Sequence, residues 1–180
     1  MVEIKDLGLP GCHLIGYPIH KDKRGILAKP FHAPTFRLHN LPVSFGEDFF
    51  SGSHRDVLRG FHVMGPPHDG GKLVYPIKGR IMDVALDLRK SLASYGRNIT
   101  VELDAQAGQA IFLGRGVAHA FLVLSDYAVI GYKTEGWHES SCDLGVHWNS
   151  AGVQWPCENP IISPRDRELV SLDKFESPFQ

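Results

Sequence analysis

Three basic side chains lie on two neighbouring apolar segments and are the residues of this sequence best suited to chemistry. Arg59 and His62 belong to residues 57–62, and Lys72 follows His62 by ten residues, within residues 71–74. Short apolar segments beside glycines are typical of β-strands, which hold side chains at fixed positions. We therefore expect a pocket for an anionic ligand with a proton-transfer group inside it. For any one of the three residues alone, solvated surface charge is the competing interpretation.

The spacing of Arg59 and His62 sets a structural requirement. The two residues are three positions apart, and successive side chains of a strand point to opposite faces. Both can therefore face one pocket only if the strand contains a bulge or a twist.

Two histidines, His62 and His119, each stand beside an apolar strand segment and near a glycine. A lone histidine of this kind is more often a structural residue, but two of them favour a shared pocket. His62 is the candidate general base, because imidazole titrates near neutral pH. It needs a carboxylate to orient its ring. The candidates are Asp83, Asp87 and Asp166, and their spacing does not choose between them.

Tyr132 belongs to the apolar segment 127–134, in which it shares a face with Ala128 and Ile130. If those two side chains point inward, so does the phenol, which can give or take a proton. Lys72 is the candidate cation for stabilising an oxyanion. A base, an acid and a cation around one cavity suit proton abstraction next to a carbonyl. The competing interpretation of Tyr132 is a core tyrosine held by one hydrogen bond.

The elements that must position these groups are short strands. Nineteen glycines and twelve prolines divide the chain into short pieces, which favours β-structure with many turns. Residues 81–88 alternate in polarity, with Asp83 and Asp87 on one face, which predicts a half-buried strand. Further strands are expected at 73–77, 109–113, 120–124 and 127–134, and short helices near Asn40 and beyond Pro164. We predict an all-β fold, an antiparallel sandwich or jelly roll with a few short helices, as one domain over residues 1–180.

A catalytic metal is the main alternative use of the histidines. Metal sites in this fold usually draw on a His-x-His pair, a nearby glutamate and a distant histidine. Here Met64 stands two residues after His62, and the first acidic residue beyond it is Asp69. His68 is the remaining histidine that could join His62 and His119. The sequence therefore favours a site with no metal and no cofactor, and a metal-dependent cupin isomerase or oxygenase is the alternative.

Composition excludes several classes of partner. The 180 residues carry a net charge of -1, from 19 basic and 20 acidic residues, without a long run of one sign. This balance argues against nucleic acids and membrane surfaces as partners, since both need concentrated positive charge. No secretory signal or run of transmembrane length is present. The three cysteines lie far apart without CxxC spacing, which predicts reduced thiols and a cytoplasmic location.

The motifs of this chain resemble those of the dTDP-4-dehydrorhamnose 3,5-epimerase family, the metal-free cupins of deoxysugar synthesis. The similarity extends from about Asp22 to Asp166. Its strongest parts are residues 57–62 (VLRGFH), 71–74 (GKLV), 83–89 (DVALDLR), 118–126 (AHAFLVLSD) and 132–134 (YKT). The order and spacing of these motifs are specific.

The resemblance implies an activity and a role for each matching residue. Such enzymes take a nucleotide-linked 4-keto-6-deoxyhexose, remove a proton beside the ketone and return one on the opposite face of the ring. By resemblance, His62 is the base, Asp166 orients it, Tyr132 is the acid, and Lys72 steadies the enolate oxygen. The substrate contacts implied are Arg24, Ser51, Ser53, Arg59 and His119. The family also implies an all-β fold, a double-stranded β-helix jelly roll (cupin) with a few short helices, and a homodimer.

Five positions in the expected substrate-binding region depart from the family pattern. Glu47 and Phe49 stand where a glutamine and an asparagine are usual, Lys29 replaces an acidic residue, and Trp137 and His138 replace two tyrosines. We expect Lys29, Glu47, Trp137 and His138 to contact the substrate. Thymidine is the nucleoside that the family implies, cytidine or guanosine is possible, and inversion at C3, C5 or both stays open. A cupin that binds a sugar nucleotide without catalysis is a further alternative.

Overall fold

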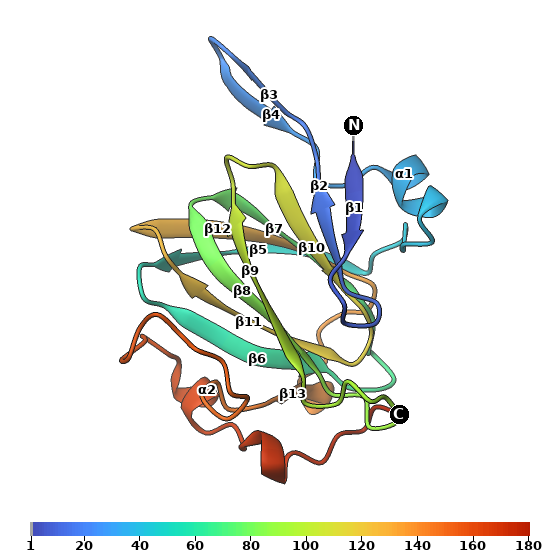
Figure 1. Ribbon diagram of the computed structural model, residues 1–180, viewed down its shortest axis with the longest axis vertical. Helices are drawn as coiled ribbons and strands as arrows, with labels where there is room; N and C mark the ends of the chain where they lie inside the picture. Colours follow the sequence, from blue (N-terminus) through green and yellow to red (C-terminus); the bar gives the residue numbers. More distant parts are fainter. Residues whose placement is uncertain (1) are drawn as a thin grey trace.

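The computed structural model describes residues 2–180, so residue 1 of the predicted domain 1–180 lies outside the described part. Two β-sheets face each other, and every pair of named strands is antiparallel (Figure 1). The larger sheet has the order β1 (Glu3–Asp6), β2 (His13–Gly16), β10 (Gln109–Leu113), β7 (Lys72–Lys78), β12 (Tyr127–Thr134) and β5 (Glu47–His54). The smaller has the order β13 (Asp143–Gly145), β6 (Leu58–Met64), β11 (Val117–Val123), β8 (Arg80–Asp87) and β9 (Asn98–Asp104). The predicted all-β jelly roll is confirmed.

The helices are as short as the sequence predicts. They are α1 (Ala33–Leu38), α2 (Pro164–Arg167) and the 3-10 turns η1 (Ser140–Cys142) and η2 (Leu172–Lys174). In α2, the Ser163 hydroxyl accepts a hydrogen bond from the Asp166 amide at 3.0 Å, and Pro164 occupies the first turn. Both are typical of helix N-termini, because they satisfy or remove amides that have no partner inside the helix.

The interior between the two sheets is one apolar cluster. Val74 and Ile130 of the larger sheet pack against Ala85 and Phe121 of the smaller one, and Tyr132 belongs to the same cluster. Ala128 is also buried there. The inward orientation predicted for Tyr132 is therefore confirmed.

The strand predicted at residues 81–88 is confirmed as β8, but the prediction that it is half-buried is wrong, because both of its faces are covered. Val84 and Leu86 pack beneath the segment that follows β13, whose Phe175 and Phe179 are buried against them. This segment follows the outer side of β6 and β13 (Figure 1). The carboxylates that made the opposite face look exposed, Asp83 and Asp87, are fully buried and paired.

Strand β6 contains the bulge that Arg59 and His62 require. Its ladder with β11 pairs His62 with His119 but Arg59 with Phe121, so three residue steps on β6 oppose two on β11. Gly60 lies within the bulge at φ 113°, and a Cβ atom there would lie 2.4 Å from the His119 carbonyl oxygen. Only glycine fits this backbone position without strain.

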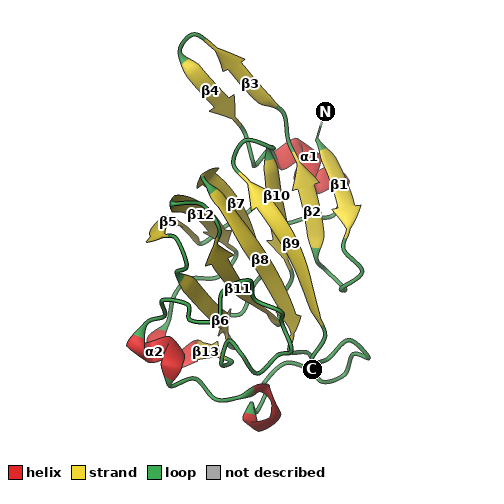
Figure 2. Cartoon of the chain, turned by 60° about the vertical axis from the view of Figure 1, so that its left-hand side comes forward, coloured by secondary structure: helices red, strands yellow, loops and turns green. Residues whose placement is uncertain are grey.

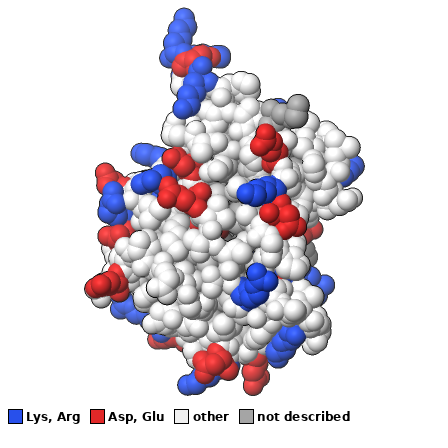
Figure 3. All heavy atoms as spheres, in the orientation of Figure 1, with Lys and Arg blue, Asp and Glu red and all other residues white. Residues whose placement is uncertain are grey.

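A separate two-stranded hairpin projects from the body of the molecule. It consists of β3 (Ile19–Asp22) and β4 (Gly25–Ala28) and extends beyond both sheets (Figure 1 and Figure 2). Ile26 and Leu27 on this hairpin are 50% and 65% exposed. Elsewhere, Lys, Arg, Asp and Glu side chains are interspersed over the face drawn in Figure 3. None of the helices in residues 2–180 has the length and apolar character needed to cross a membrane.

Candidate active site

A cavity of about 310 Å³ opens between the two sheets and contains most of the predicted site residues. It is bordered by β5, β7 and β12 of the larger sheet and by β6 and β11 of the smaller one. Those of the predicted residues that line it are Glu47, Ser51, Arg59, His62, Lys72, His119, Tyr132, Trp137 and His138. The sequence motifs therefore converge on one cavity.

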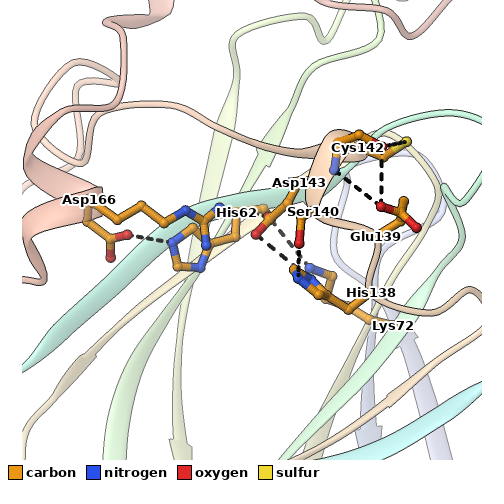
Figure 4. Close-up of polar contacts among 10 residues, drawn as sticks. His62, Lys72, His138, Glu139, Ser140, Cys142, Asp143 and Asp166 are labelled. Atoms are coloured by element: carbon orange, nitrogen blue, oxygen red, sulfur yellow. Dashed lines mark hydrogen bonds and ion pairs between the residues drawn. The ribbon is translucent and has the colours of Figure 1, made fainter.

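His62 lies within hydrogen-bonding distance of Asp166, the carboxylate that the family resemblance pairs with it. Its Nε2 lies 2.7 Å from Oδ1 of Asp166, which comes from α2 (Figure 4). A carboxylate only accepts hydrogen bonds, so Nε2 carries a proton, and in a neutral imidazole Nδ1 then holds the lone pair. About a third of the His62 side chain is exposed, whereas that of Asp166 is buried. The arrangement fixes the orientation of the imidazole at the cavity wall.

Asp166 is held as a carboxylate by several donors. Burial acts to raise its pKa, but the hydrogen bond and charge of His62, the Gly60 amide and Ser163 together hold the pKa below its ordinary value. The Gly60 amide donates to Oδ2 at 3.2 Å. The bulge in β6 thus also supplies a hydrogen bond to the residue that orients His62.

Asp83 and Asp87, the other two candidates for this role, have different partners. Oδ2 of Asp83 lies 2.7 Å from Nε2 of His119, and both side chains are buried. Oδ1 of Asp83 is buried without a hydrogen-bond partner in the described residues. Asp87 accepts hydrogen bonds from Arg89 at 2.6 Å and from the Ser94 hydroxyl at 2.7 Å, away from the cavity.

Lys72 is the first residue of β7, and its side chain lines the cavity. Its Nζ donates to the His62 carbonyl oxygen at 3.3 Å, so the ammonium group lies close to the base. Burial lowers the pKa of Lys72 to about 8, against the attraction of Asp143 and Asp83, which acts to raise it. An ammonium group removed from water interacts strongly with any anion that forms beside it.

Tyr132 faces the same cavity from the opposite sheet. Its side chain is buried, and its hydroxyl lies 3.1 Å from the Ser51 hydroxyl. Burial raises the pKa of Tyr132, so the phenol stays protonated at neutral pH. Its ring also meets the His119 ring edge to face, with centroids 6.2 Å apart. The imidazole of His62 and the phenol of Tyr132 thus border one space from two sides.

Arg59 has a fixed position at the cavity wall. Its Nε donates to the hydroxyl of Ser53 at 3.0 Å, and Nη2 donates to the Gly52 carbonyl at 3.3 Å. Ser53 itself is buried and does not line the cavity. Its place in the site is to hold the arginine.

Arg24 and Lys29 lie outside the cavity. Arg24 is at the turn of the projecting hairpin, where it pairs with Asp22 at 2.5 Å, and Lys29 follows β4. Both are exposed. Within this chain the structure does not bring these two residues together with the others.

The cavity is also lined by residues absent from the predicted set, among them Phe49, His68, Asp143 and Arg165. Arg165 pairs with Asp143 at 2.7 Å, and Asp143 also lies 3.9 Å from His138 (Figure 4). Arg165 directly precedes Asp166 and lies within the region of the family resemblance, so the sequence contained a signal for it. No sequence signal marked Asp143.

The histidines do not form a metal site with other ligands. Across residues 2–180, no group of three His, Cys, Asp or Glu side chains is arranged to hold a metal ion. His62 and His119 each use Nε2 for a carboxylate, and His68 instead meets the Trp137 ring at 4.9 Å between centroids.

Comparison with known proteins identifies a family over nearly the whole chain. The sequence matches the family model described as dTDP-4-dehydrorhamnose 3,5-epimerase over residues 6–174. The dTDP-4-dehydrorhamnose 3,5-epimerase of Shigella flexneri is 35% identical over 173 residues, which cover 93% of this chain and 96% of that protein.

Solved structures show the same similarity. The dTDP-4-dehydrorhamnose 3,5-epimerase from Sulfolobus tokodaii superposes with a TM-score of 0.92 at 31% identity, covering 99% of each chain. A dTDP-6-deoxy-D-glucose-3,5-epimerase from Legionella pneumophila, solved in complex with dTDP-4-keto-L-rhamnose, has a TM-score of 0.92 at 28% identity. That match covers 98% of this chain and 95% of the other.

Proposed function

Since the chain belongs to the dTDP-4-dehydrorhamnose 3,5-epimerase family and is an isomerase of deoxysugar biosynthesis, we propose that it inverts C3, C5 or both of a dTDP-linked 4-keto-6-deoxyhexose. The observation that carries this proposal is the placement of His62 and Tyr132 on opposite sheets around one cavity. Inversion requires proton removal on one face of the sugar ring and proton return on the other.

The residues of the cavity divide this reaction between them. Nδ1 of His62 removes the proton beside the C4 ketone, and Asp166 stabilises the imidazolium that forms. The electron pair moves onto the C4 oxygen, where the Lys72 ammonium stabilises the enolate. The Tyr132 hydroxyl then delivers a proton to the other face, which inverts the carbon. Each positioned acid or base contributes roughly 10²–10⁴-fold to such a rate.

The nucleotide diphosphate occupies the rest of the cavity in this proposal. Arg59 and His119 contact the diphosphate and sugar, and Ser51 and Ser53 hold the tyrosine and the arginine in place. Glu47, Trp137 and His138 at the cavity wall contact the nucleoside. Since these three depart from the family pattern, cytidine and guanosine are tested beside thymidine.

We propose a homodimer in which the projecting hairpin reaches the partner's cavity. Arg24 and Lys29 match substrate-contacting positions of the family, yet neither lines the cavity of its own chain. The exposed Ile26 and Leu27 give the hairpin an apolar surface to bury. A hairpin that extends away from its own body is well placed to supply Arg24 and Lys29 to a second copy.

We also propose that residues 1–180 act as one cupin-type epimerase domain in the cytoplasm. The two sheets share one interior cluster, and the family match spans residues 6–174, which supports one domain. The thiols of Cys12, Cys142 and Cys157 are free, which is compatible with a reducing compartment.

Incubation with dTDP-, CDP- and GDP-4-keto-6-deoxyhexoses in D₂O tests the reaction. With the preferred nucleotide sugar, NMR should show deuterium at C3, C5 or both of the hexose ring, and the labelled carbons should have the inverted configuration. The variant His62→Ala should lose both deuterium incorporation and inversion. Binding without any exchange in the unaltered protein would indicate a sugar-nucleotide binder instead, and dependence on an added metal would favour the metal-dependent alternative.

Mixing two inactive variants tests the hairpin. In the proposed dimer, a heterodimer of Arg24→Ala and His62→Ala contains one doubly altered cavity and one intact cavity. The mixture, refolded together, should therefore regain activity that neither variant has alone. If Arg24 served only its own chain, no intact cavity would form and the mixture would stay inactive.

A further inference from the structure

We propose that Phe49 is a positioning residue for Tyr132, and that it sets the fraction of enolate that is protonated with inversion. This inference rests on the proposed function, because it concerns the acid of the same reaction. It goes beyond that function by assigning a role to a side chain that neither the motifs nor the proton-transfer residues include.

The two rings lie face to face across neighbouring strands. Phe49 of β5 is the register partner of Tyr132 in β12. Their ring centroids are 4.7 Å apart and the ring planes differ by 13°. Phe49 lines the cavity and is 46% exposed, whereas Tyr132 is 7% exposed. Phe49 therefore covers one face of the Tyr132 ring at the cavity.

Tyr132 is held by two consecutive inward-facing residues of one strand. The Ser51 hydroxyl, 3.1 Å away, fixes the position of the phenol oxygen, and the Phe49 ring fixes the plane of the phenol. Without Phe49 the phenol keeps its hydrogen bond to Ser51 and its edge contact with the His119 ring, but one face of its ring loses its cover. The stacked ring also keeps water from Tyr132, whose burial raises its pKa and preserves the transferable proton.

The enolate has two outcomes, which makes this role measurable. A proton from Tyr132 forms the new C–H bond on the far face and inverts the carbon, after which the phenolate regains a proton from solvent. A proton returned by the His62 imidazolium restores the starting configuration. In D₂O, imidazolium that has exchanged with solvent leaves deuterium in substrate that is not inverted. The ratio of inversion to exchange therefore reports on Tyr132 separately from the base.

The experiment measures this ratio by NMR in D₂O for Phe49→Ala, Phe49→Tyr and Phe50→Ala, with Tyr132→Phe as the reference for a lost acid. Phe50 is the matched control because it is the next residue of β5, is 73% exposed and does not line the cavity. Phe49→Ala should lower the ratio roughly threefold to tenfold, the range expected for loss of one aromatic pair. Phe49→Tyr and Phe50→Ala should keep the ratio of the unaltered protein.

A merely structural role predicts a different pattern. If Phe49 only supported folding, Phe49→Ala would lower inversion and exchange together and leave their ratio unchanged, which would overturn the inference. An equal fall of the ratio in Phe50→Ala would overturn it as well. Thermal unfolding shows whether Phe49→Ala is folded, and if it is not, Phe49→Leu replaces it. A lowered ratio of inversion to exchange in Phe49→Leu then supports the inference, and an unchanged ratio overturns it.

Failure of the inference can be told from failure of the proposed function. If the unaltered protein inverts the sugar, and Tyr132→Phe lowers the ratio while Phe49→Ala does not, only the role of Phe49 is lost. If the unaltered protein neither exchanges nor inverts any of the three nucleotide sugars, the proposed function fails and the role of Phe49 with it.

Discussion

The carboxylate of Asp166 joins two parts of β6, since Oδ1 lies 2.7 Å from Nε2 of His62 and Oδ2 accepts from the Gly60 amide at 3.2 Å. Asp166→Asn keeps the shape of the side chain but removes its charge. The imidazolium formed during proton abstraction then loses its stabilising partner. We expect kcat to fall by roughly 10²–10⁴-fold, measured by deuterium exchange at saturating substrate. A variant with kcat near that of the unaltered protein would contradict the orienting role.

The same carboxylate gives a pH-dependent contribution to stability. The pKa of Asp166 is held below the ordinary value of 3.8, so the folded state favours the carboxylate. Its contribution is present above the unfolded-state pKa and is lost as pH falls through the folded-state pKa. The stability gap between the unaltered protein and Asp166→Asn should therefore shrink below about pH 4, in urea unfolding at a series of pH values. A gap that stayed constant down to about pH 2 would be inconsistent with the lowered pKa.

The activity should decline on the alkaline side as Lys72 loses its proton. Burial lowers the pKa of Lys72 to about 8, and only the ammonium form stabilises the enolate. Above that pH we expect kcat to fall by about tenfold per pH unit. In Lys72→Arg the guanidinium stays charged, so the decline near pH 8 should disappear, although the rate at neutral pH is lower. An unchanged alkaline decline in this variant would assign it to another group.

Lys72 should also lower the stability of the fold. Its folded-state pKa of about 8 lies below the ordinary 10.5, so the unfolded state binds more protons between these values and stability rises with pH there. Below about 8 the full cost of burying the ammonium is present. Lys72→Met should therefore raise the free energy of unfolding at neutral pH by roughly 1–3 kcal/mol while it removes activity. Denaturant unfolding that finds this variant less stable would refute the expectation.

Gly60 should not tolerate a side chain. A Cβ atom there would lie 2.4 Å from the His119 carbonyl oxygen and 2.7 Å from the Ala120 Cα, at a backbone φ of 113°. We expect Gly60→Ala to lower the free energy of unfolding by more than about 2 kcal/mol and to abolish exchange. Gly152→Ala is the matched control, because its φ of 70° is also positive but its Cβ meets nothing within 4 Å. Equal effects of the two substitutions would mean that contact with β11 is not the cause.

Local patterns predicted the strands and the inward direction of Tyr132, because alternation and glycine turns are properties of neighbouring residues. They also predicted the bulge, since Arg59 and His62 are three residues apart. Local patterns could not identify the partner of His62, because His62 and Asp166 are 104 positions apart in the sequence and only folding brings α2 to β6. The family resemblance made that choice.

Burial was misjudged at β8 for a related reason. The alternation of Asp83 and Asp87 with apolar residues is also what a solvent-facing strand would show. In the folded protein Asp83 is paired with His119, which is distant in the sequence, and Asp87 is paired with Arg89, two residues further along the chain. These partners offset the energetic cost of burying the two carboxylates. Sequence alternation records polarity but not the presence of such partners.

The bulge at Gly60 couples the position of Arg59 to the position of His62. This one backbone position lets Arg59 and His62 both line the cavity, so in the proposed reaction the loss of that glycine would impair substrate binding and proton abstraction together. A related protein that bound the same ligand without catalysis would be expected to keep Gly60 and to have another residue in place of His62. Inspecting these two positions is therefore a simple way to separate silent binders from working enzymes among proteins of this shape.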